Sequence, residues 1–184
     1  MDNLYSKIKT NTTRGVGSNI YRNYAHAVAY IFSVDKKEKL LGSGSGIIIT
    51  KTGDVITNHH VIMNSDRIIV FLKPSSRDVT AEEIFESSIY ETNLVKIDPE
   101  KDLALIRITS PPINISTVTL GSNKQILVGD NVHAIGHPDG APWVYARGTI
   151  GQLWPNKKWI IQNNSYSATV VQTDTSINPG NSGG

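Results

Sequence analysis

The chain has 184 residues, of which 39% are hydrophobic and 18% are charged. This composition suits one folded domain or two small ones and excludes a disordered chain. The net charge of +2 is too small to indicate nucleic acid or an acidic membrane as a partner, and the absence of cysteine excludes disulfides, thiolate zinc sites and a cysteine nucleophile.

Residues 1–24 are polar and predict a flexible N-terminal arm. Their basic residues are not followed by an apolar segment, so the arm lacks the pattern of a secretory signal peptide. Arg14 and the run 11–13 would suit a transit peptide, but the acidic Asp2 argues against one. No apolar run reaches membrane-spanning length. The compartment stays unknown, with a cytoplasmic location as the default expectation.

Short apolar runs separated by turns follow, and this pattern predicts β-strands. Six candidates in the first half begin near Ala27, Gly46, Asp54, Arg67, Tyr90 and Leu103. The charged run 35–39 is typical of a solvated hairpin loop. A short helix is expected at 81–85, within a polar loop. The Gly/Ser run 42–46 is not interpreted as a phosphate loop, because a strand follows it where a helix would be needed.

Two adjacent histidines, His59 and His60, raise the question of a metal site. Neighbouring strand residues point to opposite faces, and no Glu-x-x-His pattern lies nearby, so a metal site is disfavoured. A histidine acting as a general base is the favoured interpretation, because neutral imidazole accepts a hydroxyl proton near pH 7. Asp102, at the mouth of an apolar strand, is either a turn cap or an acid held against a histidine.

Four further strand candidates begin near Asn131, Val144, Trp159 and Ala168. Gly148 and Gly151 indicate bends or bulges in the second of these strands. His133 is expected on a strand and His137 in a loop, and neither is expected to be a ligand.

The segment 173–184 holds Ser182 between Asn181 and two glycines. Gly180 permits a backbone that turns N–H groups inward, and the N–H groups of Gly180 and Ser182 would then form an oxyanion hole. The alternative is a polar turn with an incidental serine. A serine nucleophile needs a base and an orienting acid from elsewhere in the chain.

The order His60, Asp102, Ser182 and its surroundings resemble the trypsin-like serine proteases, in particular the HtrA (DegP-like) branch. The similar motifs are 42–48, 57–61, 102–106, 136–140 and 173–184. In the family pattern the catalytic histidine stands just before a valine. The resemblance therefore selects His60 over His59, a choice that the residues alone leave open.

The resemblance implies a role for each of these residues. Ser182 would attack a peptide carbonyl, His60 would take its proton, and Asp102 would hold the imidazole in the right tautomer. The oxyanion would be bound by backbone N–H groups of the segment Gly180, Asn181 and Ser182. No metal or cofactor is implied. The expected substrates are polypeptides, unfolded proteins among them, and the family allows an oligomer.

Ile177 and Ser176 are expected beside the pocket for the substrate side chain. An apolar wall at Ile177 suits a small or medium aliphatic side chain, and Ser176 offers no carboxylate to pair with arginine or lysine. Asn181 is neutral, so it cannot pair with a newly cleaved N-terminus. Activation by N-terminal cleavage is therefore not expected.

The expected fold is all-β, with two antiparallel six-stranded barrels and the active site between them. The first barrel covers 25–112 and the second 113–184. Only about four strand candidates fall in the second barrel, so it is expected to be incomplete at the C-terminus, and the chain is expected to hydrolyse peptides poorly. The alternative is a catalytically silent protease-like module that binds peptide or protein. An α/β-hydrolase esterase is disfavoured because that fold has the order Ser, Asp, His.

Overall fold

The structure is a computed structural model and describes residues 15–75, 89–161 and 164–184. The strands are β1 (Val28–Val34), β2 (Leu40–Ile48), β3 (Asp54–Thr57), β4 (Arg67–Phe71), β5 (Ile89–Asp98), β6 (Leu103–Ile108), β7 (Asn131–Gly136), β8 (Val144–Ile161) and β9 (Asn164–Thr173). The helices are α2 (Val16–Tyr24) and α3 (His59–Ile62), with 3₁₀ turns η1 (Ala25–Ala27), η2 (Pro99–Lys101), η3 (Asn123–Gln125) and η4 (Pro138–Gly140). The short helix expected at 81–85 lies outside the described residues.

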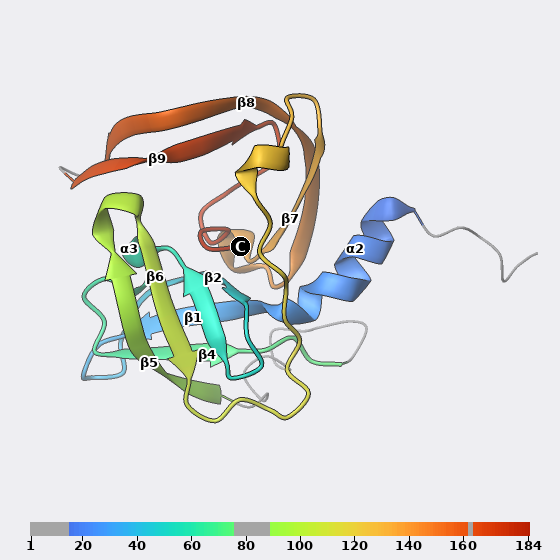
Figure 1. Cartoon of the computed structure of the whole chain (residues 1–184). Coiled ribbons are helices and arrows are strands. Elements are labelled where there is room, and N and C mark those ends of the chain that lie inside the picture. The colour runs from blue at the N-terminus through green and yellow to red at the C-terminus, as the bar shows by residue number, and fades with distance from the viewer. Residues whose placement is uncertain (1–14, 76–88, 162–163) are drawn as a thin grey trace, which may run out of the picture.

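Strands β1 to β6 close into an antiparallel barrel in the order β1-β2-β3-β6-β5-β4 (Figure 1). All six strands predicted for the first half are present, so the predicted first barrel is confirmed. Its interior is filled by fully buried aliphatic side chains, namely Ile31, Ile48, Val55, Val70, Ile106 and Ile108. Closure leaves no unpaired sheet edge among the described strands of the first half.

Strand β1 is buried on both faces. Ala29 and Ile31 belong to the core of the barrel, whereas Val28 and Tyr30 belong to a second apolar cluster that includes Trp143. Successive side chains of a strand point to opposite faces, so β1 serves both clusters at once. The barrel wall is therefore also the surface on which the second half of the chain packs.

The Gly/Ser run 42–46 lies within β2 and not ahead of it. A Cβ on Gly46 would lie 2.6 Å from side-chain carbons of both Ile31 and Val55. A larger residue would collide with the barrel core at this point, so the glycine allows a close approach inside a strand.

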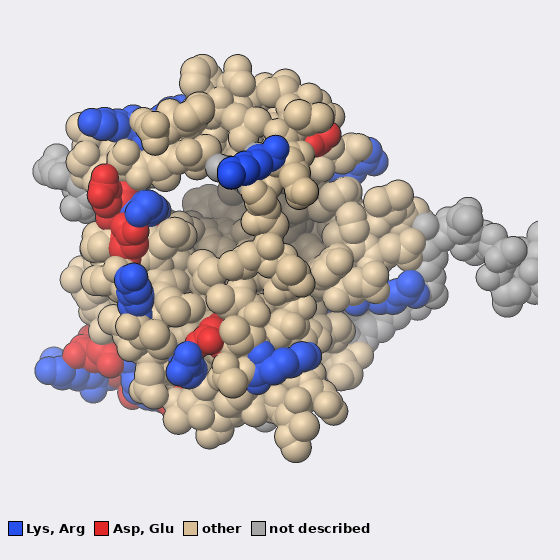
Figure 2. Space-filling model, in the orientation of Figure 1, with Lys and Arg blue, Asp and Glu red and all other residues tan. Residues whose placement is uncertain are grey.

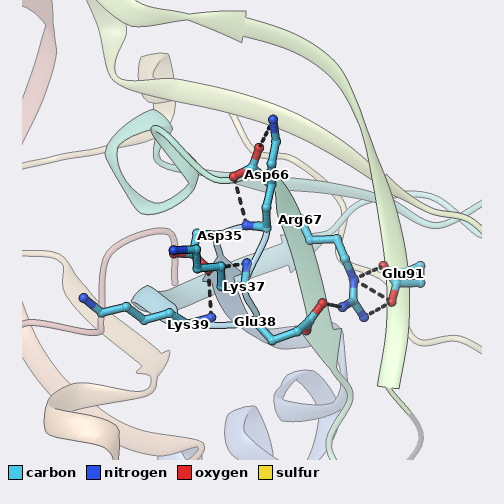
Figure 3. A network of polar contacts seen from close by, with 8 residues as sticks. Asp35, Lys37, Glu38, Lys39, Asp66, Arg67 and Glu91 are labelled. Carbon is cyan, nitrogen blue, oxygen red and sulfur yellow. Dashed lines mark hydrogen bonds and ion pairs between the residues drawn. The ribbon is translucent and has the colours of Figure 1, made fainter.

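The charged run 35–39 forms the hairpin turn between β1 and β2, as predicted (Figure 3). The Asp35 carboxylate accepts the backbone N–H groups of Lys37 and Lys39 at 2.8 and 2.9 Å. Arg67 on β4 pairs with Glu38 of the turn and Glu91 of β5. These pairs are exposed, so their contribution to stability is small.

The second half contains a three-stranded antiparallel sheet in the order β7-β8-β9. The prediction of separate strands beginning near Val144 and Trp159 was wrong, because both belong to the 18-residue strand β8. The pairing register shifts between Trp154 and Lys157, so Pro155 and Asn156 form a bulge inside one strand where the sequence indicates a turn. The irregularity expected at Gly151 is present, since the register also shifts between Ile150 and Gln152.

The expectation of an irregular arm up to residue 24 was wrong for Val16–Tyr24, which form helix α2. The helix lies beside the second sheet, where Tyr21 meets Tyr145 edge to face with ring centroids 6.5 Å apart. A Cβ on Gly17 would lie 2.4 Å from the Tyr145 hydroxyl. This contact is made between distant segments, so a local reading of a polar sequence does not reveal it. None of the described helices is long and apolar enough to cross a membrane.

Candidate active site

The adjacent histidines lie on the one-turn helix α3, directly after β3. The strand alternation used to separate them therefore does not apply. The His59 backbone N–H donates to the Asp102 carbonyl at 3.1 Å, and the His60 backbone N–H donates to Asp102 Oδ1 at 2.9 Å. The His60 ring Nδ1 lies 2.6 Å from Asp102 Oδ2. The ring that faces the carboxylate is thus that of His60.

Asp102 is both a turn cap and a partner of the histidine. It follows η2 with a left-handed backbone, φ 55°, and its N–H donates to the Pro99 carbonyl. Asparagine and aspartate tolerate this conformation better than most residues. Its side chain is 14% exposed, whereas that of His60 is 46% exposed. The two interpretations left open by the sequence are therefore compatible.

The geometry assigns the tautomer of His60. An ionised carboxylate only accepts hydrogen bonds, so Nδ1 must carry the proton in the contact with Asp102. In the neutral ring Nε2 is then unprotonated and can accept a hydrogen bond. This is the protonation state that a general base needs.

Ser182 lies in a glycine-rich loop packed against the barrel. The Ser45 N–H on β2 donates to the Ser182 carbonyl at 2.7 Å. A Cβ on Gly44 would lie 3.1 Å from this carbonyl and 2.8 Å from Val61, the residue after His60. The Ser182 backbone is thus brought to the edge of the barrel that carries α3. No hydrogen bond joins the Ser182 hydroxyl to His60 in the described part of the chain.

The loop's N–H groups differ in what they bind. The Asn181 N–H donates to the Asn178 carbonyl at 3.0 Å and so has an internal partner. Within the described ranges, the N–H groups of Gly180 and Ser182 have no hydrogen-bond acceptor. Of the three residues named for the oxyanion hole, these two have donors to offer, and Asn181 does not.

The segment before the loop is held by Asp174, whose carboxylate accepts the Thr149 N–H at 2.5 Å. This backbone hydrogen bond lowers the pKa of Asp174. A Cβ on Gly148 would lie 2.4 Å from Thr175 Oγ1, so this glycine serves a close contact and not the predicted bend.

The two residues predicted to lie beside the substrate pocket are at the surface. Ile177 is 57% exposed, and Ser176 is also exposed.

A cleft of about 740 Å³ lies between the barrel and the β8–β9 hairpin. The barrel side includes Asn58, Asp102 and Leu103, and the hairpin side includes Trp159 and Val170. Figure 2 shows the molecule hollowed between these two parts, and the C-terminus lies between them in Figure 1. The cleft is open to solvent beside the His60–Asp102 pair.

Two residues of this region were not singled out as site residues by the sequence. Ser45 and His137 are both fully buried, and their side chains are hydrogen-bonded to each other behind the Ser182 loop. Both fall inside the motifs 42–48 and 136–140, which carried the family resemblance. The motifs gave no sign that the two segments touch, because they are far apart in the sequence.

A family model described as trypsin-like peptidase domain matches residues 44–184. The chain belongs to this family. Over 159 aligned residues it is 34% identical to Protease Do-like 1, chloroplastic, of Arabidopsis thaliana. The alignment covers 83% of this chain and 32% of that protein. The chain is 35% identical over 153 residues to a probable periplasmic serine endoprotease, DegP-like, of Pseudomonas putida, which covers 82% of the chain and 28% of the relative.

Among solved structures, an HtrA-type protease with a tripeptide superposes with a TM-score of 0.74 at 32% identity. The match covers 92% of this chain and 50% of that one. The resemblance to the HtrA branch of the trypsin-like peptidases is thus confirmed. The chain spans about a third of the length of the curated relatives named here.

The default expectation of a cytoplasmic location was wrong. The relatives named here are chloroplastic in one case and periplasmic in the other.

Proposed function

We propose that this chain is the protease domain of an HtrA-type serine endopeptidase, with His60, Asp102 and Ser182 as its triad. The observation that carries the proposal is the 2.6 Å contact from the His60 ring to the Asp102 carboxylate. It orients an imidazole as a base on the barrel edge that meets the Ser182 loop. The family match and the named serine endoproteases support the same chemistry.

In the proposed reaction the Ser182 hydroxyl attacks the carbonyl carbon of a peptide bond, and His60 Nε2 takes the hydroxyl proton. Asp102 stabilises the imidazolium that results. The negative charge on the carbonyl oxygen is met by the N–H groups of Gly180 and Ser182, which have no internal acceptor in the described residues. Each such donor typically contributes about 10²–10³ in rate. His60 then protonates the leaving amine, and water hydrolyses the acyl-enzyme by the same steps.

The proposed substrates are polypeptides bound in an extended form along the open cleft. The solved HtrA-type relative is described as holding a tripeptide, which supports a peptide ligand for this chain. Ile177 remains the candidate for contact with the substrate side chain that precedes the scissile bond. A series of fluorogenic peptides that differ only at that side chain tests this assignment. A preference for lysine or arginine over valine and alanine would contradict it.

Covalent labelling with a fluorophosphonate probe tests the nucleophile. It is sharper than a turnover assay, because it needs only one chemical event and the sequence predicts slow hydrolysis. We expect the probe on Ser182 and none on Ser182→Ala, while Ser176→Ala is labelled as the wild type is. Absence of labelling in a folded wild type would favour the catalytically silent alternative. Oligomerisation stays a prediction, which light scattering during size-exclusion chromatography tests.

A further inference from the structure

A buried serine of the barrel contacts the loop that carries the proposed nucleophile. Ser45 Oγ donates to the Gly180 carbonyl at 2.8 Å. The same oxygen accepts the His137 backbone N–H at 3.1 Å and lies 2.9 Å from His137 Nδ1. One hydroxyl thus joins β2, the loop after β7 and the residue two before Ser182.

The hydroxyl determines the protonation of the histidine. A serine hydroxyl has one hydrogen, and the Gly180 carbonyl can only accept it. Nδ1 of His137 must therefore donate to Ser45 Oγ. Burial lowers the pKa of His137 to about 3, so the ring is neutral and Nε2 is unprotonated. Nε2 is buried and has no hydrogen-bond partner among the described residues. The single ring N–H of the neutral His137 is thus donated to Ser45.

The ring is also immobilised by aromatic neighbours. It stacks on Tyr30 with centroids 4.1 Å apart and an interplanar angle of 7°, and it makes a T-shaped contact with Trp143 with centroids 4.9 Å apart. Its solvent exposure is zero. Because the ring is packed rigidly, it can hold its hydrogen-bond partner in a fixed position.

The loop that carries His137 contacts the nucleophile segment at the backbone as well. The Asp139 N–H donates to the Pro179 carbonyl at 2.8 Å. A Cβ on Gly180 would lie 2.2 Å from the His137 carbonyl, so only glycine fits here. The Asn178 amide also donates to the Asp139 carboxylate at 2.9 Å.

These contacts hold both peptide units that flank Gly180 by their carbonyls. In a trans peptide the C=O and N–H groups point in opposite directions. Anchoring the Pro179 carbonyl on Asp139 therefore turns the Gly180 N–H away from that loop. Anchoring the Gly180 carbonyl on Ser45 turns the next N–H toward the Asn178 carbonyl, which is where it donates.

We propose that Ser45 and His137 are positioning residues of the protease. Through the Gly180 carbonyl they hold the Asn181 N–H on the Asn178 carbonyl and so fix the loop that presents the N–H groups of Gly180 and Ser182 to an oxyanion. The inference rests on the proposed function, because that function makes Ser182 the nucleophile. The contacts of the loop can be tested without measuring catalysis.

The chain offers matched controls. Ser33 is as buried as Ser45 and also donates to a backbone carbonyl, that of Gly42, within the hairpin of β1 and β2. His133 lies on β7 and bonds the Tyr145 hydroxyl through Nδ1 at 2.7 Å. The test set is S45A against S33A, and H137F against H137N, with H133N as a further control. Asparagine can place an amide N–H near Nδ1 of histidine, whereas phenylalanine keeps the ring but has no donor.

The first measurement is backbone amide exchange in the purified 184-residue chain. We expect the amides of Asn181 and Asp139 to exchange roughly five to ten times faster in S45A and H137F, in line with loss of one buried hydrogen bond. S33A and H133N should leave both rates as in the wild type, and H137N should restore most of the protection. Equal exchange in S45A and S33A would overturn the inference.

The second measurement is the rate of fluorophosphonate labelling at Ser182. We expect a loss of about 100-fold in S45A and H137F, as for a reacting group displaced by about an ångström, with substrate KM nearly unchanged. Labelling at the wild-type rate in both variants would overturn the inference. If the wild type is not labelled while loop exchange responds as expected, the positioning contact stands and the proposed function fails.

Discussion

The two halves of the molecule are stabilised in different ways. The barrel closes on itself around side chains with no exposure, such as Ile31 and Ile106. The three-stranded sheet leaves Ile160 of β8 76% exposed, and Trp143, the residue before β8, is buried against Tyr30 of the barrel. The second half is thus ordered largely by contact with the first. The loop of the proposed nucleophile follows the same rule, since it is fixed to β2 through Ser45.

The largest expected effect is the loss of peptide hydrolysis when a proposed triad residue from either half is removed. His60→Ala on the barrel should lower peptide hydrolysis by several orders of magnitude, about as far as Ser182→Ala from the second half, because triad members act as a unit. His59→Ala should retain most activity, since its recorded contact with Asp102 is through the backbone. Initial rates with a fluorogenic peptide measure this. A dead His59→Ala beside an active His60→Ala would reverse the assignment.

The next comparison is one of stability. Ile106→Ala in the closed barrel should lower the free energy of unfolding by about 2–5 kcal/mol, because it leaves a cavity in a fully buried core. Ile160→Ala on β8 should change it by less than about 0.5 kcal/mol, because that side chain is mostly in water. Urea unfolding followed by circular dichroism gives both values. Similar losses would mean that the hairpin has a buried face on this side.

The contact between the halves should be sensitive to acid. Burial lowers the pKa of His137 to about 3, whereas the unfolded residue titrates near 6.5. Below pH 6.5 the unfolded chain takes up a proton that the folded chain refuses, so stability is complete above that pH and falls as the pH drops toward 3. Among the described residues, the ring contacts the neutral groups Tyr30, Trp143 and Ser45, and burial is the cause of its lowered pKa.

The expected loss at pH 5 is about 2 kcal/mol of unfolding free energy relative to pH 7, from about 1.4 kcal/mol per pH unit. Other histidines and carboxylates titrate in the same range, so the measurement is the difference between wild type and His137→Asn at each pH. That difference should narrow as the pH falls from 7 to 5. A constant difference would show that His137 takes up its proton in the folded chain.

The smallest expected effect concerns the exposed ion pairs of Figure 3. Arg67→Ala removes the contacts to Glu38 and Glu91, all of which lie at the surface. Screening by water limits such pairs to about 1 kcal/mol or less. Thermal unfolding at low and high salt should show a small difference from the wild type that salt reduces further. A large loss independent of salt would mean that Arg67 packs as part of the barrel.

Much of the barrel and the pairing of His60 with Asp102 could be predicted from the sequence. Alternating and continuous apolar runs between turn residues predict strands directly, because the two-residue side-chain period of a strand shows within a few neighbouring residues. The motif surroundings selected His60, and the structure brings its ring to Asp102. Helix α3 was missed because a single turn carries too few residues for a helical period to register.

The long strand β8 and helix α2 were missed for a different reason. Pro155 and Asn156 are typical turn residues, but pairing with β9 on both sides of them continues the strand through a bulge. Helix α2 is polar, and its place depends on Tyr145, which is far away in the sequence. For β8 the pairing across the hairpin outweighs the local turn preference, and for α2 a contact with a distant segment does so.

The sequence by itself determined the six strands of the barrel and the glycine-rich loop around Ser182, and its family motifs selected His60 and Asp102 as the proposed base and acid partner. Only the tertiary structure decided that Ser45 and His137 meet behind that loop, that the Asn181 N–H is already engaged, and that the second sheet rests on β1. The physical reason is that periodicity and turn chemistry act over a few residues. A hydrogen bond from β2 to Gly180 spans 135 positions and exists only after both halves have folded together.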